Sequence, residues 1–221
     1  MLVEFVSIAV GTFIGLLPIA NPFSTAVVFL ALTGRYSEFE RRETARQASF
    51  YMACVLWVFL IAGVLIMNFF GISLPAVRIA GGLIVAGIGF GMLGGGPGEA
   101  SLESDGPGSG IAFTPLAMPM MSGPGSIAVT IGMAAGSEGV LNQLAIAVGI
   151  GAVALISWLV LREAHRVVGF LGSVGMEALT RIMGFLLVCV GAQFIVVATT
   201  EILSSEEFMR PILETIDRVS G

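Results

Sequence analysis

The pentapeptide Pro18-Ile19-Ala20-Asn21-Pro22 decides the predicted architecture, because a close copy, Pro115-Leu116-Ala117-Met118-Pro119, follows it 97 residues later. Each copy lies inside a long apolar stretch without charged residues. Proline removes a backbone donor and clashes with the preceding turn of a helix, so both pairs are expected to break or kink their helices. The sequence therefore predicts two interrupted helices, one in each half of the chain.

Further matches extend the likeness between the halves. Arg78-Ile79-Ala80-Gly81 matches Arg181-Ile182-Met183-Gly184 at a spacing of 103 residues, and Ala26-Val27 matches Ala128-Val129 at 102. The spacing increases around Ser122-Gly123-Pro124-Gly125, so the second copy carries extra residues there. We expect a duplication with one repeat over about 5–94 and the other over about 111–203. A linker at 95–110 separates the repeats, and a tail follows at 204–221. The alternative is two unrelated halves that pack through small residues.

The composition places the chain in a membrane. Of its 221 residues, 56% are hydrophobic and 11% are charged, whereas soluble domains carry about 25% charged residues. Six uncharged stretches are long enough to span a bilayer, and after trimming they lie near 5–33, 47–69, 76–94, 111–135, 140–161 and 180–203. We expect an all-α, polytopic membrane protein in which 1–221 form a single transmembrane domain. With three spans in each repeat the second repeat is inverted, an arrangement typical of secondary transporters.

The arginines predict the orientation, because positively charged loops remain in the cytoplasm. Seven arginines fall after the first span or between the fifth and sixth spans: Arg35, Arg41, Arg42, Arg46, Arg162, Arg166 and Arg181. Only three fall on the opposite side. We therefore expect a multi-pass protein of the inner (cytoplasmic) membrane with both termini outside. Residues 162–179 contain a short apolar piece that favours an interfacial or re-entrant segment.

A substrate site is expected where the first and fourth spans are interrupted. Backbone groups freed by proline cannot face lipid, and matched interruptions in two repeats point to a transporter's binding site. The predicted binding residues are Asn21, Ser24, Thr25, Ser122, Gly123 and Ser126, and the predicted helix breaks are Pro18, Pro22, Pro115, Pro119 and Pro124. Helices that start near Pro22 and Pro124 would present N–H groups to a carboxylate. The alternative is that the prolines merely kink two packing helices whose polar residues bond the backbone.

The residue inventory limits the chemistry. No Asp or Glu lies at mid-depth in a predicted span, so the substrate is expected to be zwitterionic or neutral. Arg78 and Arg181 are expected at opposite faces, where they cap neighbouring helices or act as gates. Lysine is absent, and one histidine and two cysteines are too few for a usual zinc site. We expect no enzyme activity, metal or cofactor, and the net charge of −5 argues against nucleic acid.

The same motifs, together with Phe70-Gly71-Ile72-Ser73, resemble the MarC family of bacterial and archaeal inner-membrane proteins. The resemblance extends from about residue 5 to 203. It implies six spans and, in members described as SnatA-like, transport of small neutral amino acids such as glycine and alanine. We therefore predict a secondary transporter of small neutral amino acids, with Na⁺ or H⁺ as candidate coupling ion. The alternatives are an exporter of other small metabolites or drugs, and a non-transporting membrane assembly protein or intramembrane enzyme.

Overall fold

The computed structural model describes residues 1–94, 110–137, 139–205, 208 and 210, and the regular elements within them are helical. Five helices are long and apolar enough to cross a membrane: α1 (Leu2–Ala20), α3 (Glu38–Phe70), α4 (Leu74–Leu93), α6 (Val140–Arg162) and α7 (Ala164–Ser204). Three shorter elements accompany them: α2 (Pro22–Leu32), η1 (Ala112–Met121) and α5 (Pro124–Ala135). The predicted linker, apart from Gly110, and most of the predicted tail lie outside the described residues.

Sequence signals explain where several helices start and stop. Ser37 caps α3 through a capping box with Glu40, so α3 begins ahead of the uncharged stretch at 47–69. The backbone N–H and hydroxyl of Ser37 lower the pKa of Glu40, because both donate hydrogen bonds to its charged carboxylate. Gly71 ends α3 in the left-handed region, with φ 66°, and Ser73 caps α4. α6 covers the whole of the predicted span at 140–161 and extends one residue further, to Arg162.

The predicted first and fourth spans are both interrupted, as the prolines indicated. α1 runs through Pro18 to Ala20, and Asn21 alone separates it from α2. η1 is irregular, with extended backbone angles at Thr114 and Met118, and two residues separate it from α5. Pro22 and Pro124 take the same place at the start of α2 and α5. Helices therefore start at Pro22 and Pro124, where the sequence predicts them.

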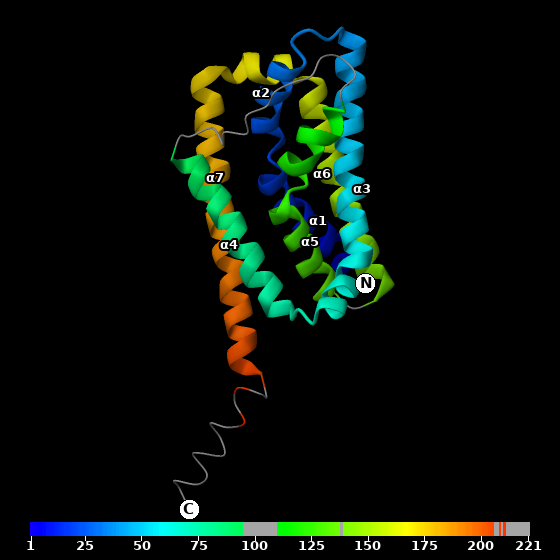
Figure 1. The fold of residues 1–221 in the computed structure, drawn as a ribbon, viewed down its shortest axis with the longest axis vertical. Coiled ribbons are helices and arrows are strands. Elements are labelled where there is room, and N and C mark those ends of the chain that lie inside the picture. The colour runs from blue at the N-terminus through cyan, green and yellow to red at the C-terminus, as the bar shows by residue number, and fades with distance from the viewer. Residues whose placement is uncertain (95–109, 138, 206–207, 209, 211–221) are drawn as a thin grey trace, which may run out of the picture.

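α7 combines a short first segment with the predicted last span. It is helical from Ala164 onward, but Gly172 takes a φ of 64° and turns the chain. Figure 1 shows the first part of α7 crossing one end of the bundle before the rest descends beside α4. The apolar piece within 162–179 is thus a short helix across the end of the bundle, as an interfacial segment would be.

Glycines bring α4 and α7 into close antiparallel contact. A Cβ on Gly82 would lie 2.6 Å from the Gly191 carbonyl oxygen, and one on Gly89 would lie 2.6 Å from that of Gly184. Only residues without side chains allow two backbones to approach so closely. The other large contacts pair α1 with α6, α3 with both α6 and η1, α5 with both α3 and α4, and α2 with both α6 and α7.

The bundle has two distinct ends (Figure 1). The N-terminus, the α3–α4 loop and the end of α7 at Ser204 gather at one end, called here the terminal end. The α2–α3 loop and the α6–α7 junction at Glu163 lie at the other, called here the arginine end. Between them the core is apolar, with fully buried side chains that include Leu16, Phe29, Met52, Leu116 and Ile150.

Candidate functional site at two helix breaks

The first break is built by Asn21, which ends α1 and caps α2. Its backbone is left-handed, with φ 37° and ψ 63°, a conformation that asparagine tolerates better than most residues. Its side-chain oxygen accepts the Ser24 N–H at 3.3 Å, and its Nδ2 donates to the Ser24 hydroxyl at 2.8 Å. Nδ2 also reaches the Met92 sulfur of α4 at 3.8 Å. Because Pro22 has no N–H, α2 can begin here without an unsatisfied donor at its first residue.

Two further polar residues tie this break to its surroundings. The buried Thr25 hydroxyl donates to the Asn21 carbonyl at 3.1 Å. The Ser24 and Thr180 hydroxyls lie 3.2 Å apart, which joins α2 to α7. Asn21, Ser24 and Thr25 therefore form one polar cluster, which extends onto α4 and α7.

The second break is formed by Ser122 and Gly123. The Ser122 N–H and hydroxyl both donate to the Ala117 carbonyl at 2.8 Å, and the Ser126 hydroxyl donates to the Met121 carbonyl at 3.0 Å. Both serines are at most 1% exposed. Gly123 precedes α5 in an extended conformation, and no side chain caps that helix. The first N–H groups of α5 thus start inside the bundle without a side-chain acceptor.

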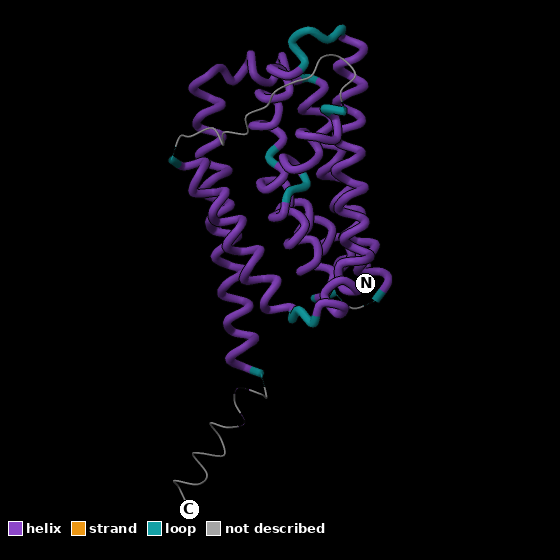
Figure 2. The backbone as a smooth tube through the Cα atoms, viewed as in Figure 1, coloured by secondary structure: helices purple, strands orange, loops and turns teal. Residues whose placement is uncertain are grey.

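The two breaks lie near each other. A Cβ on Gly125 would lie 3.4 Å from Ile19 Cγ2 and 3.0 Å from Val85 Cγ2, so the start of α5 meets the end of α1 beside α4. Figure 2 shows both breaks as short loops about halfway between the ends of the bundle. No hydrogen bond joins the two polar clusters among the described residues. The arrangement brings together two helix N-termini, of which that of α5 has no side-chain cap, with uncharged hydroxyls and apolar side chains.

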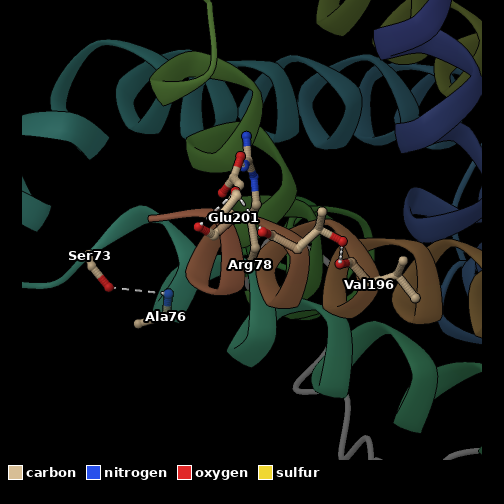
Figure 3. Close-up of polar contacts among 7 residues, drawn as sticks. Ser73, Ala76, Arg78, Val196 and Glu201 are labelled. Atoms are coloured by element: carbon tan, nitrogen blue, oxygen red, sulfur yellow. Dashed lines mark hydrogen bonds and ion pairs between the residues drawn. The ribbon is translucent and has the colours of Figure 1, made fainter. Parts of the chain in front are cut away.

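Arg78 takes part in a second polar feature, at the terminal end. Its guanidinium forms an ion pair with Glu201 of α7 (Figure 3), and its side chain is 12% exposed. It also reaches the end of α5, where a Cβ on Gly136 would lie 2.9 Å from Arg78 Nη2. A cavity of about 440 Å³ opens beside it, lined by α1, α5 and α7 and including Thr12, Ser137, Gln193 and Phe194.

Arg181 behaves differently from its predicted counterpart. It pairs with Glu177 one turn earlier on α7, at 2.6 Å, and its side chain is 56% exposed. Among the described contacts Arg181 makes no ion pair to another helix, whereas Arg78 joins α4 to α7.

Sequence reasoning missed four participants: Met92, Thr180, Gln193 and Glu201. Each is contributed by α4 or α7, the helices that flank the breaks. Thr180 directly precedes the repeat-matched Arg181, and Glu201 is an acid at a span edge. Neither residue lies in a local sequence pattern that would predict which residue it contacts.

Comparison with known proteins gives one family. Residues 6–203 of the chain match the family described as "MarC family integral membrane protein". An inner membrane protein MarC of Salmonella typhimurium is 42% identical over 218 residues, which cover 91% of this chain and 97% of that protein. The MarC protein of Escherichia coli O1:K1 is 41% identical over 223 residues, covering 93% and 99%. That of Citrobacter koseri is 41% identical over 218 residues. No solved structure matches the chain with significant similarity.

Proposed function

We propose, on the premise that this chain belongs to the MarC family of integral membrane proteins, that it is a secondary transporter of small neutral amino acids. Its relatives are inner membrane proteins and its helices are apolar, so it is a multi-pass protein of the inner membrane. In the proposal, six spans form two inverted three-helix repeats that alternate access to one site. α1 with α2, and η1 with α5, each make one interrupted span.

The pairing of helices supports the inverted repeat. If the halves correspond, α1, α2, α3 and α4 are equivalent to η1, α5, α6 and α7. The contact of α1 with α6 then has its counterpart in η1 with α3, and that of α4 with α5 in α7 with α2. The contact of α3 with α5 likewise has its counterpart in that of α6 with α2. When the halves are exchanged, the contact of α3 with α6 maps onto itself, and so does that of α4 with α7. A two-fold axis in the membrane plane would give this exchange.

The start of α5 carries the substrate assignment. A helix N-terminus holds about half a positive charge and several unbonded N–H groups, so a buried, uncapped one attracts a carboxylate. Gly125 and Ser126, in the first turn of α5, are both buried. The Ser122 hydroxyl, which donates to a carbonyl, still has lone pairs to accept from an ammonium group. The nearby Ile19 and Val85 favour a small side chain on the substrate. Asn21, Ser24 and Thr25 form the opposite wall of the proposed site.

Removal of the Ser122 hydroxyl tests this site. We expect Ser122→Ala to weaken binding of labelled glycine or alanine to the purified protein about tenfold, the loss of one hydrogen bond to a charged group. Thr130→Val is the matched control, because Thr130 is equally buried and donates to the Ser126 carbonyl one turn further along. Unchanged affinity in Ser122→Ala, or an equal loss in Thr130→Val, would contradict the assignment.

Arg78 is the candidate gate of this transporter. Through Glu201 and the end of α5 it links three helices at the terminal end, which we expect outside the cell from the arginine distribution. In this proposal the ion pair holds that end closed. Arg181, paired within α7, is exposed and anchors its helix at the membrane surface. Na⁺ or H⁺ would drive the cycle.

Labelling of the cavity beside Arg78 tests the gate. In a chain whose Cys54 and Cys189 are replaced by alanine, Ser137→Cys introduces a thiol into the cavity lining. We expect Glu201→Gln to raise the rate at which an impermeant maleimide labels this thiol several-fold, because Arg78 is released. Equal rates with and without Glu201→Gln would exclude a gate at this ion pair.

A further inference from the structure

A second cavity, separate from the helix breaks, lies at the arginine end. It has a volume of about 400 Å³ and is formed by the start of α3 and the α6–α7 junction. Its charged lining consists of Arg41, Arg42, Arg162, Arg166, Glu38 and Glu163, with His165 beside them. The cavity, called here the basic pocket, therefore joins segments that lie more than a hundred residues apart in the sequence.

Of the four arginines that line the basic pocket, three form ion pairs with carboxylates of the pocket. Arg42 pairs with Glu38 at 2.6 Å, and Glu163 pairs with Arg166 at 2.6 Å and with Arg162 at 3.5 Å. Four guanidinium groups thus face two carboxylates, so the lining has an excess of positive charge.

Arg41 is the arginine without a carboxylate partner among the described residues. Its Nη2 donates to the Thr33 carbonyl, at the end of α2, with a distance of 3.4 Å. Its Nε is buried and has no hydrogen-bond partner. A buried guanidinium donor without an acceptor costs free energy, and an anion with several acceptor oxygens would satisfy it.

Aromatic residues lie close in sequence to the arginines of the basic pocket. Trp158 lies one turn before Arg162, whose guanidinium is 5.3 Å from the centre of its ring. Phe39, beside the arginines of α3, is 79% exposed, and Phe170, on the first segment of α7, is 91% exposed. Aromatic side chains gather at the interface between hydrocarbon and headgroups. We therefore expect the basic pocket at the depth of lipid phosphates.

We propose that the basic pocket binds the phosphate group of an anionic phospholipid, with Arg41 as its central ligand. A phosphodiester offers several acceptor oxygens to the guanidinium fork, and its charge offsets the excess of arginine. Arg42, Arg162 and Arg166 surround the bound phosphate, while the acyl chains follow the apolar surface toward the membrane interior. Such a lipid would clamp the start of α3 to the α6–α7 junction. The inference does not depend on transport.

Thermal unfolding of the full chain in nanodiscs tests the proposal. We expect phosphatidylglycerol to raise the unfolding temperature relative to phosphatidylcholine, and Arg41→Gln to lose most of this increase. Arg46→Gln is the matched control, because Arg46 lies on the same helix, is held by Glu43 at 2.6 Å and does not line the basic pocket. If Arg41→Gln does not fold, Arg166→Gln, at a side chain 84% exposed, replaces it with the same expectation.

Three results would overturn the proposal. An equal increase in phosphatidylcholine would mean that the lipid's charge is irrelevant. An equal loss in Arg46→Gln would mean that overall surface charge, and not the basic pocket, attracts the lipid. Stabilisation by inorganic phosphate or glycerol phosphate in phosphatidylcholine nanodiscs, equal to that by phosphatidylglycerol, would assign the pocket to a soluble anion.

Discussion

Asn21 has two separable roles in the first break. Its backbone adopts the left-handed conformation that lets α1 end and α2 begin, and its side chain caps α2 and reaches Met92. Glycine adopts the same backbone angles without penalty but offers no side chain. Substitutions at this position can therefore distinguish the shape of the break from the chemistry of its side chain.

We expect Asn21→Ala to destabilise the protein by about 2 kcal/mol, about half from the lost cap and half from the left-handed backbone. Asn21→Gly keeps the backbone conformation and is expected to lose only a few tenths of a kcal/mol. Both variants should bind glycine or alanine more weakly, because both lack the amide. Chemical denaturation and substrate binding, measured on each variant, check this. Full affinity in Asn21→Gly would show that the side chain does not contact the substrate.

The sequence locates this residue but not its neighbours. Prolines on both sides of the Ile19-Ala20-Asn21 triplet indicate an interruption, and Asn21 is the one residue there that readily takes positive φ. The contact of Ser24 with Thr180 joins residues 156 apart. No local propensity encodes such a pair, since it depends on how α2 packs against α7.

Among the helices, the contact between α4 and α7 depends most directly on the absence of side chains. Gly82 and Gly89 meet Gly191 and Gly184, so each helix presents two glycines seven residues apart. This spacing can be seen in the sequence, but it does not predict which helix packs against which. The ends of α6 are easier to predict, because Glu138 and Arg162 bound its apolar stretch, whereas α3 begins within a charged segment at Glu38.

Gly82→Ala is expected to destabilise the bundle by about 1–3 kcal/mol, because its Cβ would lie 2.6 Å from a carbonyl of α7 and force the helices apart. Gly87→Ala lies on the same helix with nothing within 4 Å of the added Cβ, so it should not destabilise. Thermal unfolding in detergent compares the two variants. Equal unfolding temperatures would mean that α4 and α7 do not pack as described.

At the scale of the whole molecule, the helices of the two halves of the chain pack against each other. The large contacts between helices join one half to the other, which brings the two helix breaks close together near the middle of the bundle. The internal likeness around Arg78 and Arg181 predicted corresponding halves, but not that these arginines make different contacts. Arg78 meets Glu201 because α4 lies against α7, whereas Arg181 has an acid one turn away on its own helix.

Counterflow in proteoliposomes tests transport most directly. Vesicles containing the purified protein are loaded with unlabelled glycine or alanine and diluted into a trace of the labelled amino acid, with and without Na⁺ and a pH gradient. A transporter of these amino acids should show transient accumulation of label above equilibrium, and the Ser122→Ala protein should show much less. Absence of accumulation for every small neutral amino acid tested, from a protein that is folded and inserted, would contradict the proposed function.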